Sequence, residues 1–371
     1  MPLILTDEQS ILKEAAEGFL SENAPIAHLR KLRDERSEDG VSRELWRAFG
    51  EMGLAGVIIP EEYGGSGLGA VEAGVVAEAI GRNLTPSPFL STGLLAARAL
   101  IDGGSEAQQA DWLPRFAAGE AIAAVAIDEG SKHRPNRIAT RAQRAGNGWK
   151  LNGSKALVID GHIADVLIVA ARTDDGVGLF LVDLGAAGLS VERTVMVDAH
   201  NAARLDLKDV SVDADALLGA ADGSVLDRVL RLGEGAVAAE MSGAAQAAFD
   251  QTLTYLRDRT QFGKAIGEFQ ALQHRAAHLY SEIEITQAVI LKALQALDAG
   301  SDDAALLLAV AKARAGKSGE LAVQEAVQMH GGVGMTDEFD VGLYMKRMRV
   351  AQELFGDAGY HTEQIARYGG Y

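Results

Sequence analysis

The segment Arg259–Lys264, followed closely by Gln270, combines a guanidinium, two amide side chains and a glycine. Arg259 and Gln261 are able to bind a polyanionic ligand that also carries amide groups, and Gly263 lets such a ligand approach the backbone closely. An ordinary turn between two helices often has the same composition. The segment therefore indicates either a ligand site or a turn.

A second candidate segment ends a long helix, where Gln328 and His330 precede three glycines in the four positions Gly331–Gly334. One glycine is enough to end a helix. Three glycines indicate that backbone amides, those of Gly331 and Gly332 above all, contact a ligand such as a phosphate or the edge of an adenine ring. A helix end without a ligand fits equally well. We expect His330 to be a packed or capping side chain rather than a general base.

Composition excludes several classes of function. The chain has 371 residues, of which 35 are Lys or Arg and 52 are Asp or Glu, so its formal net charge is −17. This charge disfavours sequence-independent binding to nucleic acid or to an anionic membrane surface. The chain has no cysteine, which excludes disulfides, thiolate nucleophiles, iron–sulfur clusters and zinc sites built on cysteine. His274 and His278 have the spacing of a zinc-binding helix but lack the usual glutamate between them, so no metal site is expected.

Localisation signals are weak. The N-terminal sequence has neither a basic start nor a long apolar run, so we expect no signal peptide. No stretch approaches the ~18 charge-free apolar residues of a membrane-spanning helix. We expect a cytoplasmic protein without membrane association.

The elements that must position the candidate side chains follow from the periodicity of apolar residues. Helical spacing predicts helices over residues 6–20, 45–54, 70–80, 91–101, 106–118, 226–259, 272–299 and 304–330. Short apolar or alternating runs predict strands within 149–155, 165–171, 177–182 and 205–210. Thr6 and Gln9 form a capping-box sequence before the first helix. The fold class is therefore α+β, with a helical domain over 1–120, a β-domain over 121–220 and a helical domain over 221–371.

Four motifs, in this order and at these spacings, resemble the acyl-CoA dehydrogenase family. They are Pro60–Gly67, Leu151–Lys155 followed by Ala164 and Asp165, Arg259–Lys264 followed by Phe269 and Gln270, and Gln328–Gly334 followed by Glu338. The resemblance covers nearly the whole chain. It implies a helical N-domain, a central β-barrel-like domain and a C-terminal four-helix bundle that supports tetramer formation.

The family binds FAD between the β-domain and the bundle, and the adenosine end of FAD reaches a neighbouring subunit. The resemblance implies contacts to FAD from Arg259, Gln261, Phe262, Gln270, Gln328, Gly331, Gly332, Asp128 and Ser131. The β-domain departs from the family pattern in two places. Asp128 replaces the usual Thr before the flavin loop, and Leu157–Ile159 replaces the usual Trp-Ile-Thr run.

The family desaturates an acyl-CoA thioester. A carboxylate removes the α-proton while the β-hydrogen leaves as hydride to the flavin. The usual base is the Glu of a Tyr-Glu-Gly sequence, and the matching position holds Phe355, which cannot accept a proton. Some members carry the Glu on the helix before the Arg-x-Gln-Phe segment, where this chain has Gly233, with Glu234 one residue further on. Asp357 is a third candidate base, and a helix N-cap is its competing interpretation.

The missing base resembles a branch in which two different chains form a heterotetramer, seen in the degradation of sterol side chains and other bulky acyl groups. The leading hypothesis is an FAD-dependent acyl-CoA dehydrogenase-type subunit of a homo- or heterotetramer in fatty acid or sterol side-chain degradation. Its substrate would be an acyl-CoA and its electron acceptor an electron-transfer flavoprotein. The alternatives are a catalytically inactive assembly subunit and a flavin monooxygenase or oxidase of the same fold.

Overall fold

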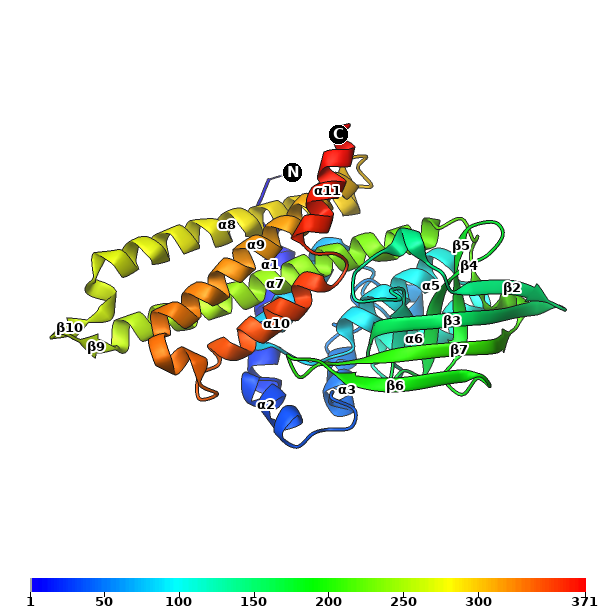
Figure 1. Cartoon of the computed structure of the whole chain (residues 1–371), viewed down its shortest axis with the longest axis horizontal. Coiled ribbons are helices and arrows are strands. Elements are labelled where there is room, and N and C mark those ends of the chain that lie inside the picture. The colour runs from blue at the N-terminus through cyan, green and yellow to red at the C-terminus, as the bar shows by residue number, and fades with distance from the viewer. Residues whose placement is uncertain (1) are drawn as a thin grey trace. The chain divides into compact units, whose positions relative to one another are not determined.

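The computed structural model describes residues 2–371, and the chain divides into two compact units (Figure 1). The first unit contains residues 2–30, Ala70–Thr85 and Glu234–Tyr371, and the second contains Lys31–Gly69 and Pro86–Gly233. N-terminal segments contribute to both units. These two compact units differ from the three domains predicted from the sequence. The boundaries of those three domains stay a prediction.

Long helices form the first unit. They are α1 (Asp7–Asn23), α4 (Ala70–Asn83), α8 (Gln270–Asp298), α9 (Ala304–His330), α10 (Val341–Glu353), α11 (Ala358–Tyr368) and the part of α7 (Ser224–Asp258) from residue 234 onward. The α8 and α9 helices lie side by side, and both α10 and α11 pack on α9 (Figure 1). The helices predicted for this unit from apolar spacing are confirmed, and α7 is one continuous helix of 35 residues.

Local and distant groups satisfy the backbone at helix N-termini in this unit. The predicted capping box of α1 is confirmed, because Gln9 N–H donates to Thr6 Oγ1 (3.3 Å) and Thr6 N–H donates to Gln9 Oε1 (3.0 Å). The first two amides of α4 donate instead to the carboxylate of Asp298, at 2.6 Å and 3.0 Å. The end of α8 therefore supplies the negative charge that a helix N-terminus favours.

Glycines allow α4 and α7 to cross at backbone distance. A Cβ on Gly81 would lie 2.0 Å from the carbonyl oxygen of Glu240, and a Cβ on Gly243 would lie 2.0 Å from that of Glu78. Neither neighbour is a flexible side chain, so the helices would have to separate to admit alanine at either position. The small residues of these helices thus determine how closely the two helices pack.

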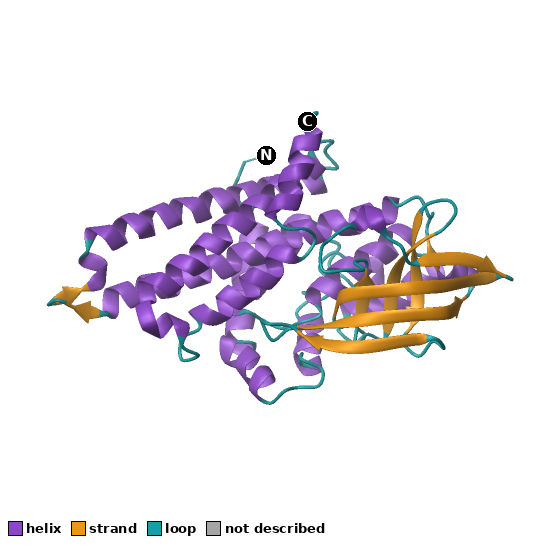
Figure 2. Cartoon of the chain, in the orientation of Figure 1, coloured by secondary structure: helices purple, strands orange, loops and turns teal. Residues whose placement is uncertain are grey.

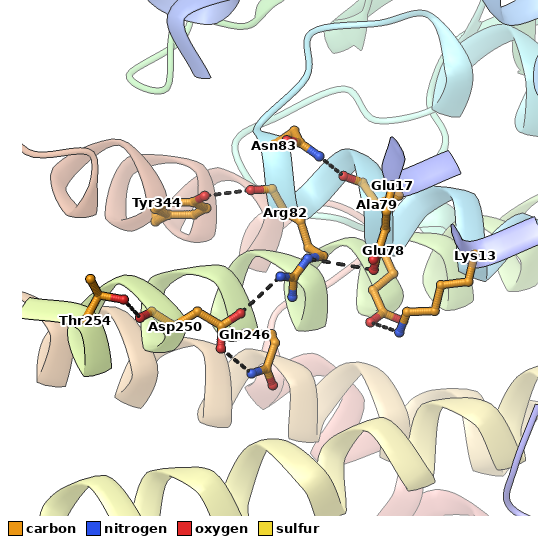
Figure 3. A network of polar contacts seen from close by, with 10 residues as sticks. All are labelled: Lys13, Glu17, Glu78, Ala79, Arg82, Asn83, Gln246, Asp250, Thr254 and Tyr344. Carbon is orange, nitrogen blue, oxygen red and sulfur yellow. Dashed lines mark hydrogen bonds and ion pairs between the residues drawn. The ribbon is translucent and has the colours of Figure 1, made fainter. Parts of the chain in front are cut away.

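Polar side chains join four helices of the unit around Arg82 (Figure 3). The guanidinium of Arg82 on α4 forms an ion pair with Asp250 on α7 at 3.0 Å, and the carbonyl of Arg82 accepts a hydrogen bond from the Tyr344 hydroxyl on α10 at 2.6 Å. Lys13 on α1 pairs with Glu78 on α4 at 2.9 Å. These contacts fix α4 between α1, α7 and α10.

Shorter helices and one large sheet form the second unit. The helical elements are α3 (Arg43–Glu51), η1 (Glu61–Tyr63), η2 (Phe89–Ala96), α5 (Ala97–Gly103), α6 (Glu106–Ala117), η3 (Pro135–Arg137) and η4 (Ala214–Ala216); α2 (Ile26–Asp34) spans the boundary between the units. The helix predicted over 91–101 begins as the π-helix η2 and continues as α5. Thr92 ties η2 to the sheet, since its hydroxyl donates to the carbonyl of Ala123 (3.0 Å) and accepts from the N–H of Ala123 (2.9 Å).

The sheet has eight strands and is mainly antiparallel (Figure 2). They are β1 (Ala123–Ala126), β2 (Arg141–Ala145), β3 (Gly148–Ile159), β4 (Val166–Arg172), β5 (Val177–Asp183), β6 (Leu189–Val195), β7 (Asn201–Val212) and β8 (Leu217–Leu218). The order is β6-β7-β3-β2-β4-β5-β8, and β1 pairs with β4 in parallel. Trp149 and Phe180 meet edge to face in the core of the sheet, with ring centroids 5.2 Å apart.

Some elements lack a sequence signal that separates helix from strand. β1 is a run of buried small residues without alternation, so its partner β4 decides its conformation. β2, β6, α2 and α11 were likewise not predicted. Across residues 2–371, the helices are either too short or too polar to cross a lipid bilayer.

Candidate functional site

The segment between α7 and α8 is a hairpin rather than an irregular loop. β9 (Thr260–Gln261) pairs in antiparallel fashion with β10 (Lys264–Ala265), and the 3-10 turn η5 (Ile266–Glu268) leads into α8. The composition of this segment alone favoured a plain turn over a ligand site. An ordered hairpin is compatible with both.

The tip of the hairpin projects an aromatic side chain into solvent. Phe262 and Gly263 have φ angles of 53° and 82°. Glycine adopts such angles freely, whereas phenylalanine is strained there. Phe262 is 91% exposed, and it lies edge-on to Phe269, whose ring also carries the Lys264 ammonium 4.3 Å from its centroid. Contacts with Phe269 and Lys264 therefore order the hairpin tip, and among residues 2–371 no other part of the first unit covers the outer side of Phe262.

The polar side chains predicted to bind a ligand lie on the hairpin or next to it. Arg259, Gln261 and Gln270, the first residue of α8, are all exposed. The amide nitrogen of Gln261 donates to the carbonyl of Thr260 at 2.8 Å, which orients the amide group along the strand. The hairpin thus presents guanidinium, amide and aromatic groups together.

The three glycines after α9 have three different explanations. Gly331 has φ +67° and ψ −145°, a conformation that favours glycine. Gly334 packs tightly, because a Cβ there would lie 2.8 Å from the carbonyl oxygen of Val327. Gly332 is exposed and a Cβ would meet nothing within 4 Å, so neither backbone angle nor packing requires glycine there. Gly332 is therefore the glycine of this set that a ligand best explains, and Gln328 in the last turn of α9 is also exposed.

His330 is a packed side chain. Its Nδ1 atom lies 2.7 Å from the carbonyl oxygen of Ala326, and its ring stacks on Tyr255 with centroids 4.4 Å apart. Burial lowers the pKa of His330 below the usual range for histidine, so the ring stays neutral near pH 7. The expectation that this histidine is packed is confirmed.

Phe355 occupies a strained turn between α10 and α11. Its φ is +55°, and its side chain is 7% exposed. The carbonyl of Phe355 lies 2.8 Å from His361 Nε2, and Gly356, with φ +98°, lies against the ring of Tyr360. A bulky residue held at positive φ indicates that its surroundings determine the shape of this turn.

Asp357 is the N-cap of α11. Its carboxylate accepts a hydrogen bond from the N–H of Tyr360 at 2.8 Å. The N-cap interpretation of Asp357 is confirmed. Because the cap uses one oxygen of this carboxylate, a role as base would require Asp357 to leave the helix terminus.

Lys312 on α9 is the centre of this region. It is 1% exposed, and its ammonium donates to the carbonyls of Ala351 (3.2 Å), Gln352 (3.2 Å) and Gly356 (3.0 Å). Burial lowers the pKa of Lys312 from 10.5 to about 8, against the opposing effect of nearby carboxylates. Among these carboxylates, that of Glu234 raises the pKa of Lys312 most. Lys312 therefore connects the end of α10, the turn with Phe355 and the helix that carries Glu234.

Sequence reasoning missed Lys312. A lysine in the apolar stretch 304–315 was the available signal, because a cation in such a stretch must either reach solvent or find partners inside. The same holds for a buried ion pair between Glu240 on α7 and Arg347 on α10, whose charged atoms lie 2.6 Å apart. The basic run 346–349 is typical of a solvated helix face, but Arg347 is only 7% exposed, so that interpretation is wrong for this residue.

In the second unit, Asp128 is engaged within its own loop. Its carboxylate lies 2.9 Å from His133 Nδ1 and accepts a hydrogen bond from the N–H of Arg134 at 3.1 Å. The adjacent Glu129 accepts from the N–H groups of residues 139 and 140 at 2.7 Å and 2.8 Å, and from the buried Lys155 ammonium at 2.9 Å. Desolvation raises the pKa of Glu129, but these hydrogen bonds outweigh it and lower the pKa to about 2.

The loop between these acids and β2 borders a cavity of about 330 Å³. Its lining comprises Ile127, Glu129, Gly130, Ser131, Lys132, Arg134, Arg137 and Ile138. Ser131, predicted to contact a ligand, is therefore at a cavity, whereas Asp128 faces the loop interior. Leu157 is 42% exposed at φ +53°, so it presents an apolar side chain at the surface of this unit.

Sequence comparison covers nearly all of the chain. Residues 6–120, 121–210 and 224–369 match the N-terminal, middle and C-terminal domains of acyl-CoA dehydrogenase, in that order. The chain belongs to the acyl-CoA dehydrogenase family. The family predicted from four motifs is thus confirmed, together with the succession of helical, β and helical regions.

Known acyl-CoA dehydrogenases resemble the chain over its full length. Mitochondrial isovaleryl-CoA dehydrogenase of Pongo abelii is 31% identical over 98% of this chain and 88% of its own length. The ChsE4–ChsE5 complex of Mycobacterium tuberculosis has a chain with TM-score 0.92 and 28% identity, covering 100% of this chain and 99% of its own. The Tcur3481–Tcur3483 steroid ACAD has TM-score 0.90 and 33% identity, covering 97% of both chains.

The structure brings together three of the residues considered for the base. Phe355, Asp357 and Glu234 lie around Lys312 in the first unit. Asp128 and Ser131 belong to the second unit. The predicted roles of these residues and of the hairpin residues toward FAD stay predictions.

Proposed function

We propose that the chain is an FAD-dependent acyl-CoA dehydrogenase subunit that desaturates a bulky acyl-CoA together with a homologous second chain. The observation that carries the proposal is the turn at Phe355. At the position of the usual base the chain has a buried aromatic ring, and the neighbouring carboxylate of Asp357 caps a helix. The likeness to two solved heteromeric complexes, one of them a steroid enzyme, supports a partner chain that supplies the missing base.

Residues of this chain suit FAD as the cofactor. Gly332 leaves open space for a ligand beside its backbone, and the exposed hairpin carries Arg259 and Gln261 for phosphate and amide groups. In the second unit, Ser131 lies at a cavity with cationic lining. When bound, FAD would accept the hydride from the β-carbon of the acyl chain. The hairpin, whose tip this unit leaves uncovered, would hold FAD of an adjacent subunit.

If the base comes from this chain and not from the partner, Glu234 is the candidate carboxylate. Asp357 caps α11, whereas the side chain of Glu234 is half-buried and lies in the field of the Lys312 ammonium. Lys312 and its three carbonyl acceptors would hold the turn at Phe355 in place, and the apolar ring would exclude water from the acyl group.

The test begins with flavin content. The chain is purified alone and after co-expression with a homologous chain that carries the Tyr-Glu-Gly base, and both preparations are titrated anaerobically with acyl-CoAs while the flavin absorbance is recorded. We expect bleaching by acyl-CoA with the pair and none with the chain alone. Bleaching by the chain alone would refute the need for a partner, and stable flavin that no acyl-CoA bleaches would favour a monooxygenase or an inactive site.

Two substitutions locate the base. E234Q removes the ionised carboxylate near Lys312, and D357N keeps the size of the capping side chain. If the partner supplies the base, both variants of the active pair keep most of their turnover. A loss of about 100-fold or more in E234Q with little loss in D357N would assign the base to Glu234 instead.

A further inference from the structure

The proposed cofactor contact at Gly332 lies in a short segment between α9 and α10, residues 331–336, here called the glycine loop. Most of this segment is the 3-10 turn η6 (Gly331–Met335). The N–H and the hydroxyl of Thr336 both donate to the carbonyl of Val333, at 3.0 Å and 2.8 Å. These bonds shape the turn locally, but they do not attach it to another helix. The orientation of the glycine loop therefore depends on contacts with the surrounding helices.

An aromatic cluster anchors the inner side of the glycine loop. The ring of Tyr255 on α7 stacks on His330 before the loop and meets Phe339 after it edge to face, with ring centroids 4.4 Å and 5.8 Å apart. The carbonyl of Tyr255 also accepts a hydrogen bond from the N–H of Arg259 at 2.9 Å, at the base of the hairpin between α7 and α8. Both ends of the loop thus pack on one residue, which also borders the hairpin.

Arg30 on α2 supplies an anchor of a different kind. Its Nε and Nη2 atoms donate to one carboxylate oxygen of Asp340 at 3.0 Å and 2.7 Å, and its Nη1 atom donates to Asp337 at 3.1 Å. Asp340 is the N-cap residue of α10, yet its side chain makes no capping hydrogen bond. One guanidinium therefore joins two carboxylates in the segment that leads from the glycine loop into α10.

The geometry of these ion pairs gives them a local effect. A single exposed ion pair contributes little to stability. The side chain of Arg30, however, is only 22% exposed and binds two carboxylates at once, and its planar fork fixes the direction of each partner. Loss of these bonds would release the segment that follows the glycine loop, while the aromatic cluster and the helices stay packed. The expected result is a local opening rather than unfolding of the unit.

We infer that Arg30 is a positioning residue that holds the glycine loop in the shape in which Gly332 meets the cofactor. The inference rests on the proposed function, in which this loop contacts FAD. Arg30 acts on the loop through Asp337 and Asp340 and needs no contact of its own with FAD. A loop that is already fixed loses little conformational entropy when its ligand arrives, so the cost of removing Arg30 is a weaker affinity for FAD.

The test compares R30Q with the matched control K31Q, which removes the same charge from an exposed position of the same helix. Hydrogen exchange of residues 331–336 is measured on flavin-free protein, and affinity for FAD is measured by fluorescence titration of the chain alone and of its assembly with the homologous chain. We expect R30Q to exchange these amides about threefold faster or more and to bind FAD about three- to tenfold more weakly. Its urea midpoint should equal that of K31Q. R30K should lie between R30Q and the wild type, because an ammonium keeps the charge but lacks the fork.

A second variant tests the same contact from the other side. D340N should weaken FAD binding, and R30Q/D340N should bind FAD no more weakly than R30Q alone, because both changes remove one interaction. If R30Q does not fold, D340N takes its place in both measurements.

Two results would overturn the inference. One is unchanged exchange of residues 331–336, and the other is faster exchange with an FAD affinity within about twofold of K31Q. Wild-type protein that binds no FAD, alone or with the homologous chain, refutes the proposed function and with it the role of Arg30 toward FAD. The exchange measurement still decides in that case whether Arg30 holds the glycine loop.

Discussion

Replacing Lys312 with methionine is expected to make the stability difference from the wild type depend on pH. Burial lowers the pKa of Lys312 from 10.5 to about 8, so the folded state binds this proton more weakly than the unfolded state does. Between those two values the unfolded chain holds the proton and the folded chain does not. The contribution of Lys312 to the free energy of unfolding therefore rises with pH in this window.

The magnitude follows from the two pKa values. One pKa unit corresponds to about 1.4 kcal/mol, so raising the pH from about 7 to about 9.5 stabilises the wild type by about 2 kcal/mol relative to K312M. The measurement is urea unfolding of both proteins, monitored by circular dichroism at several pH values. K317M is the matched control, because it removes an ammonium from the exposed face of the same helix.

The sign of the pH trend is the decisive result. A difference that stays level or falls as the pH rises would mean that folding does not lower the pKa of Lys312, and it would refute the reasoning from burial. K312M also leaves the carbonyls of Ala351, Gln352 and Gly356 without their shared donor. We therefore expect the variant to be less stable than the wild type by about 1–3 kcal/mol at pH above 9. The turn at Phe355 would then become more mobile, which hydrogen exchange can detect.

Three further predictions concern charge, packing and cofactor binding in the first unit. E240A and R347A are each expected to destabilise the chain by about 3–5 kcal/mol, because each leaves a buried charge without its partner at 2.6 Å. The double variant should be less destabilised than the sum, so a double-mutant cycle by urea unfolding that gives additive effects would refute the pairing. G81A should destabilise by about 3 kcal/mol or more, since its Cβ would lie 2.0 Å from a backbone oxygen. G332A should change stability by less than about 0.5 kcal/mol yet weaken FAD binding, and unaltered FAD affinity would remove Gly332 from the cofactor site.

Much of this protein is determined within short stretches of sequence. Helical spacing of apolar residues located most of the helices, and the capping box of Thr6 and Gln9 placed the start of α1. The four motifs identified the family, and the resemblance predicts that Phe355 stands at the position of the usual base. These features depend on neighbours within a few residues or on a resemblance carried by short segments, so they do not need the fold.

The tertiary structure decided which charges are buried and what they contact. Lys312 meets carbonyls about 40 residues further along the chain, and Glu240 meets Arg347 across 107 residues. Asp128 was a candidate cofactor contact and Asp357 a candidate base by sequence, and in the structure their carboxylates contact the loop and the helix around them. Such contacts join residues that are far apart in sequence, and their strength depends on removal from water. Sequence periodicity reports which face of an element is apolar, whereas only packing reveals which polar group is enclosed there and with which partner.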